Sequence, residues 1–595
     1  MSTSAPRASR RLRDVVTDDT RRQAYLDSGA WDATTLAGRV RAHARETPDA
    51  VAVVDLLGER RRSYAELRND AERVAGFLRE AGVSPGDVVA VQLPNRYETV
   101  AIALGILMAG AVINPMLPIY RAKELRYMLT VGRTRVMFLP DGYRGHDHVS
   151  MVGALEPELP DLTTRVVVPL EGGPAVPGVA EIGRRDPPRT RPPRHRFAAS
   201  VDPGDRVRAP QDLAALRRWI PAWLPFASVL ARSADSPGPE PLAGDVSELI
   251  FTSGTEADPK AIMHTEQTTN FSVRAAWTSL SMDRDDVVWM PSPVGHSTGF
   301  NYGVRMALYH GLKLVLQDRW DGAEAARLVE AERCTYTLAA TTFLRDIVAA
   351  AGRGAGDISS MSMFGCGGAP VPPELVRAAS ELGVTALRLY GSTEVLVATW
   401  NRRSSPLEKR VETDGLAVDG VEVEVWDGGG RPVAGQPGEI QTRGPNTCVG
   451  FFEDPWRTAA TFHPDGWVRS GDVAVMDGDG HLTVVGRVKE IIIRGGLNIA
   501  PREIEDLLLR MPGVRAVAVV GLPHDRLGEI GCACVVPDAG VEITLEAVVA
   551  HLESAGLARY KQPERLVLVD AIPMTSTGKI QKFRLVEAIR EQDAR

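Results

Sequence analysis

Short apolar runs alternate with longer segments of helical periodicity along most of the chain. Six runs read as strands, and they cover residues 88–94, 134–140, 164–170, 286–293, 312–317 and 384–391. Strands that alternate with helices are typical of parallel sheets covered by helices. The pattern therefore predicts an α/β fold.

The alternation of strands and helices changes twice toward the C-terminus. From Leu416 onward, short strand-like runs are separated by glycine-rich turns, which predicts a small antiparallel unit. After Gly486 a compact α+β segment begins, with probable strands in the runs VRAVAVVGLP and GCACVVPD. Cys532 and Cys534 alternate along the second of these runs, so both are expected on one buried face.

One uncharged stretch, residues 100–119, has the composition of a membrane span. Asn114, Pro115 and Pro118 interrupt it, and its strictly apolar part ends at Ile113. A span needs about 20 consecutive apolar residues. A buried helix ending at Gly110 and a short strand after it fit better, so we predict no membrane segment.

Composition and charge exclude several classes of protein. The 595 residues carry a formal net charge of −7, which argues against nucleic-acid binding. The five cysteines are scattered, so neither a disulfide framework nor a zinc site is predicted, and the reducing cytoplasm is the expected location. The basic N-terminus has no apolar core behind it and is not a secretory signal.

One segment departs from ordinary globular composition. Residues 183–196 contain six arginines and four prolines against one acidic residue. Because proline blocks regular structure, an exposed loop is the first interpretation and a docking surface for an acidic partner the second.

The first candidate for chemistry is the run LIFTSGTEADPKAIMHT, residues 249–265. It offers the hydroxyls of Thr252, Ser253 and Thr255, a glycine at Gly254 and the cation of Lys260. Small hydroxyl residues and glycine after a strand suit phosphate binding, although the GxxxxGK[ST] spacing of the common P-loop is missing. Alone, the run is equally consistent with an ordinary Ser/Thr turn.

Five further motifs follow in order along the chain. They are FGCGGAPVP (364–372), YGSTE (390–394), GWVRSGD (466–472), GRVKEIIIRGGLNIAPREIE (486–505) and PMTSTGK (573–579). Each one alone has an ordinary explanation as a turn or a surface residue. All six in this order resemble the adenylate-forming superfamily, which includes acyl-CoA synthetases, and the resemblance covers about residues 40 to 590.

The resemblance implies a domain organisation. We expect a flexible extension over 1–35 and a large domain over 36–487 with parallel sheets and a small β-barrel-like subdomain. The Arg/Pro-rich insertion occupies 183–222 of that domain. A hinge over 488–490 and a mobile α+β lid over 491–595 follow.

The resemblance also implies roles in the binding of ATP and magnesium. The loop Thr252–Thr255 with Lys260 would enclose the β and γ phosphates, and Glu394 with Thr393 would hold magnesium. Lys579 would bridge the acyl carboxylate and the phosphate. The other predicted nucleotide contacts are Gly368, Ala369, Pro370 and Tyr390 at adenine, Asp472 and Arg487 at the ribose, and Gly391 and Ser392 as further ATP-binding residues.

The resemblance also implies which residues contact the acid and the thiol acceptor. His296 and Phe300 would line the acyl pocket, Lys489 would be the hinge, and Gly495 and Gly496 would line the thiol tunnel. The run PVGHSTGFNYG lacks an acidic residue to pair with a substrate ammonium, so an apolar acid is favoured over an amino acid. Within the superfamily, the sequence most resembles cyclohexanecarboxylate- or medium-chain-acid:CoA ligases.

Several departures from the family pattern leave alternatives open. Glu256, Ala257 and Ala261 alter the phosphate loop, and Ile493 replaces a lysine that some relatives use in thioester formation. Adenylation is therefore better supported than the thiol step. The acceptor could be free CoA, a carrier's phosphopantetheine or a separate thiolating partner, and a homodimer stays open. A non-catalytic adenylate sensor is a third class.

A serine hydrolase is the remaining alternative. GHSTG at 295–299 is a G-x-S-x-G motif with Ser297 at its centre, placed after a strand-like run and before a helix-like one. Histidines follow it at 463, 481, 524 and 551.

Overall fold

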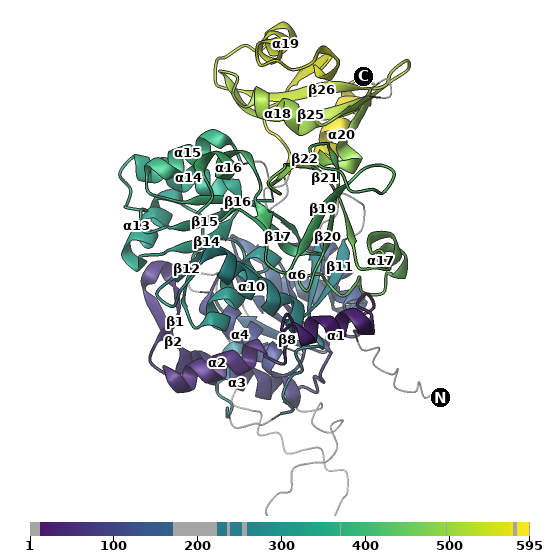
Figure 1. The fold of residues 1–595 in the computed structure, drawn as a ribbon. Helices are drawn as coiled ribbons and strands as arrows, with labels where there is room; N and C mark the ends of the chain where they lie inside the picture. Colours follow the sequence, from purple (N-terminus) through teal and green to yellow (C-terminus); the bar gives the residue numbers. More distant parts are fainter. Residues whose placement is uncertain are drawn as a thin grey trace, which may run out of the picture.

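The computed structural model describes residues 12–170, 223–234, 238–252, 259–368, 371–494, 497–574 and 580–593. It has a large body built on three sheets and a smaller C-terminal body that sits above them (Figure 1). The Arg/Pro-rich insertion predicted over 183–222 lies outside the described residues.

The largest sheet has nine strands and carries the adenine-side motifs. Its central strands are parallel, and antiparallel strands close both edges. The order is β18 (Leu416–Ala417), β17 (Leu396–Trp400), β16 (Ala386–Ser392), β15 (Met363–Cys366), β14 (Tyr336–Ala339), β12 (Val287–Met290), β13 (Lys313–Leu316), β1 (Val51–Asp55) and β2 (Arg60–Ser63).

The second sheet has seven strands and carries the phosphate motif at one edge. Its strands are parallel except for the edge pair β10–β11. The order is β11 (Lys260–Thr265), β10 (Val246–Thr252), β4 (Val112–Pro115), β3 (Val88–Val91), β5 (Val136–Pro140), β8 (Thr164–Val168) and β9 (Trp223–Pro225). Both parallel sheets confirm the predicted α/β class.

Two smaller sheets follow, besides a two-stranded ribbon of β6 (Gly142–Tyr143) and β7 (His146–Asp147). The subdomain expected to resemble a barrel is a four-stranded antiparallel sheet, β19 (Glu422–Trp426), β20 (Gly438–Arg443), β21 (Val468–Met476) and β22 (Leu482–Arg487). The C-terminal sheet contains β24 (Leu497–Ile499), β23 (Ile492–Arg494), β26 (Gly528–Pro537), β25 (Val514–His524) and β27 (Arg565–Leu568).

Helices cover these sheets. In the large body they are α1 (Asp19–Asp27), α2 (Leu36–Glu46), α3 (Tyr64–Glu80), α4 (Tyr97–Met108), α5 (Ala122–Val131), α6 (His148–Leu155), α9 (Phe226–Leu230), α10 (Glu266–Leu280), α11 (Ser297–Gly299), the π-helix η4 (Phe300–Arg305), α12 (Met306–His310), α13 (Gly322–Glu332), α14 (Thr341–Gly352), α15 (Pro373–Glu381), α16 (Leu407–Glu412) and α17 (Pro455–Thr461). The C-terminal body has α18 (Pro501–Leu508), α19 (Leu545–Ser554) and α20 (Lys582–Asp593).

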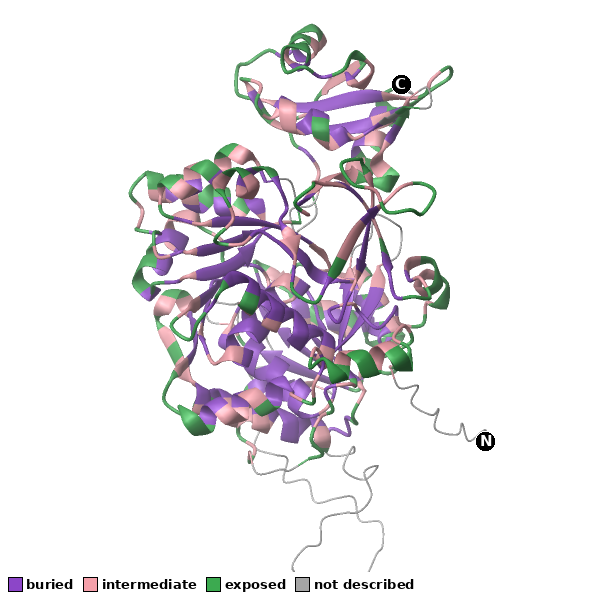
Figure 2. Ribbon diagram, viewed as in Figure 1, coloured by how far each residue is buried: buried purple, intermediate pink, exposed green. Residues whose placement is uncertain are grey.

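Helix α4 is the uncharged stretch that could have suggested a membrane span. All of its residues except Glu98 are buried, and it packs closely against α3. A Cβ on Gly105 would lie 2.5 Å from the Cβ of Val74, so this contact requires glycine. Burial on every side explains an apolar helix without periodicity (Figure 2). Among the described residues, none of the helices combines the length and hydropathy that a membrane crossing needs.

The N-terminal segment differs from the flexible extension predicted over 1–35. Within residues 12–35 the helix α1 forms, and the Val15 amide donates to the Val449 carbonyl at 3.0 Å. Trp31 is 2% exposed, and its Nε1 donates to the Pro445 carbonyl at 2.9 Å. For residues 12–35 the prediction is therefore wrong, because one buried aromatic and a backbone pairing anchor an otherwise polar segment. Residues 1–11 lie outside the described residues.

The two strand cysteines of the C-terminal body lie where the alternation placed them. Cys532 and Cys534 on β26 are both fully buried in the cluster between the sheet and α20. Their predicted role in packing is confirmed.

Candidate active site

The phosphate motif joins two neighbouring strands. Thr252 ends β10 and Lys260 begins β11, and the two residues face each other in the antiparallel register. The loop between them, which holds the predicted residues Ser253, Gly254 and Thr255, lies outside the described residues. The strand ends nevertheless define where that loop starts and returns.

Lys260 meets the predicted magnesium ligand. Its Nζ lies 3.3 Å from Glu394 Oε1, and the same ammonium lies 5.8 Å from the ring centroid of Phe451. Burial acts to raise the pKa of Glu394, but the Lys260 charge and hydrogen bonds outweigh it, and the pKa is lowered. Glu394 is therefore ionised at neutral pH, beside a cation suited to a phosphate.

Glu394 is held by a tight hairpin between β16 and β17. Gly391 is required there, because a Cβ at that position would lie 2.0 Å from the Leu396 carbonyl oxygen. The Ser392 hydroxyl accepts a hydrogen bond from the Glu394 amide at 3.2 Å. The YGSTE motif thus forms a compact turn that presents Glu394 toward Lys260.

Two predicted nucleotide residues bind the carboxylate of a third. Tyr390 Oη donates to Asp472 Oδ2 at 2.9 Å, and Arg487 Nε donates to Asp472 Oδ1 at 2.8 Å. Asp472 and Arg487 are cross-strand partners on β21 and β22. Burial raises the pKa of Tyr390 well above its usual value, so its hydroxyl stays protonated and donates. The structure therefore fixes both oxygens of Asp472.

The remaining adenine residues lie at the end of β15. Gly368 is exposed and has φ +77°, which glycine adopts without strain. Ala369 and Pro370 lie outside the described residues.

Asp472→Ala is expected to raise the KM for ATP roughly 10- to 100-fold, because hydrogen bonds to a charged group contribute about 1.5–3 kcal/mol each. The effect should appear in acid-dependent exchange of pyrophosphate into ATP. Asp477→Ala is the matched control, because Asp477 lies just beyond the same strand and pairs with Lys409. An unchanged KM for ATP in Asp472→Ala would remove Asp472 from the nucleotide site.

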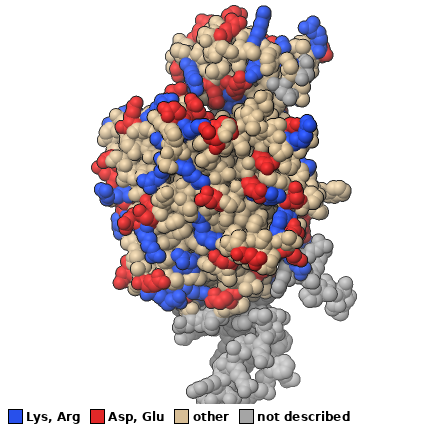
Figure 3. Space-filling view, in the orientation of Figure 1, with Lys and Arg blue, Asp and Glu red and all other residues tan. Residues whose placement is uncertain are grey.

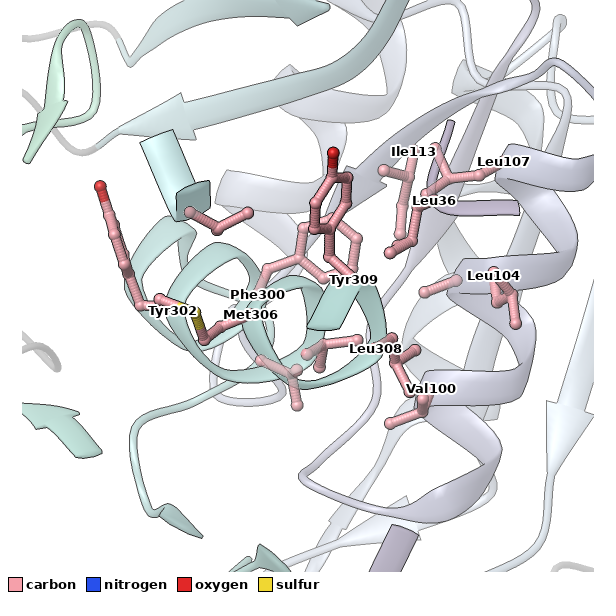
Figure 4. Packing of buried hydrophobic residues seen from close by; sticks show 14 of the residues in the cluster. Leu36, Val100, Leu104, Leu107, Ile113, Phe300, Tyr302, Met306, Leu308 and Tyr309 are labelled. Atoms are coloured by element: carbon pink, nitrogen blue, oxygen red, sulfur yellow. The ribbon is translucent and has the colours of Figure 1, made fainter. Parts of the chain in front are cut away.

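The predicted acid residues lie at the start of a helix against the hydrophobic core. His296 is the N-cap of α11, and its Nδ1 accepts from the Thr298 amide at 3.3 Å. Phe300 is 1% exposed and begins the π-helix η4. Phe300 faces the cluster that includes α4 (Figure 4). A small apolar cavity, about the size of one water molecule, lies beside it, and its lining includes Val91, Leu93, Ala103, Ile113 and Val304.

Ser297, the centre of the hydrolase motif, is buried in the same region. It is 5% exposed, and its Oγ accepts a 3.5 Å hydrogen bond from Asn301 Nδ2. A hydrolase nucleophile is exposed at the top of its turn. The hydrolase alternative therefore gains no support from the geometry of GHSTG.

The hinge prediction falls between two anchored residues. Arg487 is bound to Asp472 in the large body, whereas Glu490 Oε2 lies 3.2 Å from Lys582 Nζ on α20. Lys582 also pairs with Glu505 at 2.8 Å. Only Val488 and Lys489 separate these anchors. Gly495, Gly496 and Lys579, the other predicted residues of this body, lie outside the described residues.

Lys489→Pro is expected to slow one half-reaction by at least about tenfold and to retain the other. Proline fixes φ near −65° and would hold the lid in one orientation if the chain pivots here. Pyrophosphate exchange and thioester formation from preformed acyl-adenylate report the two halves separately. Lys489→Ala, which keeps backbone freedom, should retain both, and equal rates for both halves in the proline variant would argue against this hinge.

His264 is a site residue that the sequence motifs did not predict. This residue is fully buried on β11, and its Nε2 donates to the Thr393 carbonyl at 2.7 Å. Burial lowers the pKa of His264, so the ring is neutral at pH 7. The signal that could have identified His264 is its place within the mostly apolar run AIMHT.

These contacts join predicted nucleotide residues into two bonded groups, Lys260 with Glu394, and Asp472 with Tyr390 and Arg487. Family models match most of the chain. Residues 40–452 match the AMP-binding enzyme model and residues 503–579 match the model of its C-terminal domain. The chain belongs to the family of AMP-binding enzymes.

Similar proteins come from one group of ligases. A medium-chain fatty-acid–CoA ligase of Escherichia coli (strain K12) is 33% identical over 96% of this chain and 93% of its own length. A salicylyl-CoA synthase / salicylate adenylyltransferase of a Streptomyces species is 31% identical over 95% of this chain and 96% of its own. The crystal structure of the anthranilate CoA ligase AuaEII matches with a TM-score of 0.79 at 20% identity, covering 95% of this chain and 98% of its own, which shows a common fold.

Proposed function

We propose that the protein is an AMP-forming acid:CoA ligase for an apolar carboxylic acid. In the first step a carboxylate oxygen bonds to the α-phosphorus of ATP, and the bond to the bridging oxygen of pyrophosphate breaks. In the second step the sulfur of CoA bonds to the acyl carbon, AMP leaves with the acyl–oxygen bond's electrons, and the thiol proton passes to solvent.

The observation that carries this proposal is the pairing of Lys260 with Glu394. The strand that leads back from the phosphate loop places its cation 3.3 Å from the carboxylate of YGSTE. Lys260 would neutralise phosphate charge. Asp472, fixed by Tyr390 and Arg487, would accept the ribose hydroxyls and so orient the α-phosphorus.

Glu394 and Thr393 fit a magnesium ion. A lowered pKa keeps the carboxylate charged, and carboxylate and hydroxyl oxygens suit this hard cation. When bound, magnesium would offset the negative charge that develops on the transferring phosphoryl group. The Ser392 hydroxyl and the buried His264 would keep the turn in place.

The substrate class is proposed from the residues around His296. Phe300 and its neighbours are apolar, the run PVGHSTGFNYG contains no acidic residue, and the nearby carboxylate of Glu248 is already paired with Arg305. The name of the E. coli relative, a medium-chain fatty-acid–CoA ligase, supports the same class. We therefore propose medium-chain or alicyclic acids.

A second candidate is an enzyme that adenylates and passes the acyl group to a carrier or partner enzyme. The name of the Streptomyces relative combines CoA synthase and adenylyltransferase activities, which keeps this candidate in view. A panel of carboxylic acids should be tested for acid-dependent pyrophosphate release with and without CoA. Thioester formation with free CoA supports the ligase, whereas adenylation without thioester would favour the second candidate.

The charge distribution is compatible with a small-molecule substrate. Acidic and basic side chains are interspersed over the face drawn in Figure 3. Such a surface lacks the concentrated basic field that nucleic acids require.

A further inference from the structure

A buried ionic network lies between the phosphate strand and the acid-binding helix. The Arg305 side chain on η4 is 0% exposed, as is that of Glu248 on β10. Arg305 Nη2 donates to Glu248 Oε1 at 2.6 Å, Nε to Asn301 Oδ1 at 3.0 Å and Nη1 to Asn270 Oδ1 at 2.7 Å. Asn301 Nδ2 closes a ring by donating to Glu248 Oε2 at 3.0 Å. We call these four residues the Arg305 network.

Stability alone does not require such a network. Removing two charges from water carries a large desolvation penalty, and hydrophobic residues of similar volume often stabilise a core equally well. The network also fixes an orientation. Three donor groups of one planar guanidinium bind different acceptors, and so fix how three secondary-structure elements lie relative to one another.

Those elements are the ones that the proposed reaction must align. Glu248 lies four residues before Thr252, on the strand that enters the phosphate loop. Asn301 and Arg305 belong to η4, which begins directly after the turn that holds His296. The network therefore ties the acid-binding turn to the phosphate strand.

A second pair of bonds ties both elements to the YGSTE hairpin. On the far side of η4 from Phe300 (Figure 4), the Tyr302 hydroxyl accepts from the Val397 amide on β17 at 2.8 Å. On the strand side, Glu248 is the cross-strand partner of His264, whose Nε2 holds the Thr393 carbonyl. The acid turn, the phosphate strand and the hairpin of Glu394 thus form one bonded frame.

We propose that Glu248 and Arg305 are positioning residues for adenylation: they hold the acid-binding turn against the phosphate strand so that the carboxylate meets the α-phosphorus in line. This inference rests on the proposed adenylation. A misplacement of about 1 Å between reacting groups can cost about 10²-fold in rate. Loss of the network should therefore lower kcat while leaving the binding of each substrate largely intact.

The test uses two variants of the full chain. Glu248→Leu/Arg305→Met removes the two charges of the closest pair together, while the buried Glu266, whose Oε2 lies 3.6 Å from Arg305 Nη1, keeps its hydrogen bond from the Leu36 amide. Arg305→Lys keeps the ion pair with Glu248 but cannot make all three directed bonds. We expect kcat of acid-dependent pyrophosphate exchange to fall about 10- to 100-fold in the double variant and less in Arg305→Lys, with KM for ATP and for the acid within about threefold of wild type.

Arg60→Lys is the matched control. Arg60 forms an ion pair with Asp55, whose side chain is 1% exposed, on strands away from the phosphate loop. The unfolding temperature of Arg60→Lys should fall by about as much as that of Arg305→Lys, while the kcat of Arg60→Lys stays at the wild-type value.

The outcomes separate this inference from the proposed function. Absence of acid-dependent exchange in the wild type would refute the proposed function and this inference with it. Wild-type exchange with an unchanged kcat in Arg305→Lys would refute the inference alone, and this variant decides if the double variant does not fold. A fall in kcat that only tracks the loss of unfolding temperature, in Arg60→Lys as in Arg305→Lys, would show a purely structural role.

Discussion

Replacing Lys579 with alanine is expected to reduce acid-dependent pyrophosphate exchange by about 10²–10³-fold, the usual loss when one donor that stabilises a transition state is removed. Lys579 matches the family lysine that bridges the acyl carboxylate and the phosphate. Because the charge is needed only while the carboxylate attacks, kcat should fall more than the KM for ATP rises. Exchange of radiolabelled pyrophosphate into ATP measures both quantities.

Lys561→Ala is the control for this variant. Lys561 belongs to the same C-terminal body and pairs with Glu503 at 2.6 Å, away from the proposed site. It should keep wild-type exchange. Full activity in Lys579→Ala would contradict the assigned role, whatever the control shows.

Glu394→Gln is expected to lower kcat by about 10²–10³-fold and to raise the magnesium concentration needed for half-maximal activity. The amide keeps the shape of the side chain but removes the charge that pairs with Lys260 and would bind the ion. Exchange assays across a magnesium titration measure both effects. Glu424→Gln, on β19 of the neighbouring sheet, is a matched control with no predicted contact to ATP.

The effect of Glu394→Gln on the unfolding temperature is expected to depend on pH. The pKa of Glu394 is lowered in the folded protein, so its ion pair contributes stability above the unfolded value of 4.5 and loses it as the pH falls through the folded pKa. Between pH 6 and 8 the unfolding temperatures of wild type and Glu394→Gln should differ by a constant amount, and the difference should shrink only at acidic pH. A difference that changes between pH 6 and 8 would contradict a permanently ionised Glu394.

The sequence predicted the parts of the fold that local patterns encode. Strands buried on both faces appear as unbroken apolar runs, so β3, β5 and β8 were found with small shifts at their ends. Helix α4 was predicted because the uncharged run from Val100 is too short for a membrane span, since Asn114 and Pro115 follow it, and is therefore expected to be buried. Lys260 and Glu394, which the resemblance assigned to phosphate and to magnesium, lie 3.3 Å apart, a contact that the sequence did not predict.

Tertiary contacts without a local signal were missed. Arg305 and Glu248 stand 57 positions apart, and each looks like a surface residue in its own segment until the fold buries both. The anchoring of residues 12–35 depends on Trp31 and one backbone pairing rather than on any periodicity. The contact between Tyr390 and Asp472 likewise depends on how two sheets meet.

The Arg305 network changes how the site is understood. Nucleotide residues come from the hairpin β16–β17 and from β21 and β22, whereas the acid turn belongs to η4 and its preceding loop. A rigid, buried set of hydrogen bonds would hold these segments, which lie far apart in the sequence, so that they act at one phosphorus atom. In the proposed mechanism the C-terminal body would then need to supply only Lys579 and, after a turn at the predicted hinge, the path for the thiol.

The central claim is tested most directly by incubating the protein with ATP, magnesium and single carboxylic acids, without CoA, in the presence of radiolabelled pyrophosphate. The account predicts label in ATP only when an apolar acid is present, and AMP with an acyl-CoA thioester once CoA is added. Formation of ADP and phosphate, or no exchange with any acid of a broad panel, would contradict it.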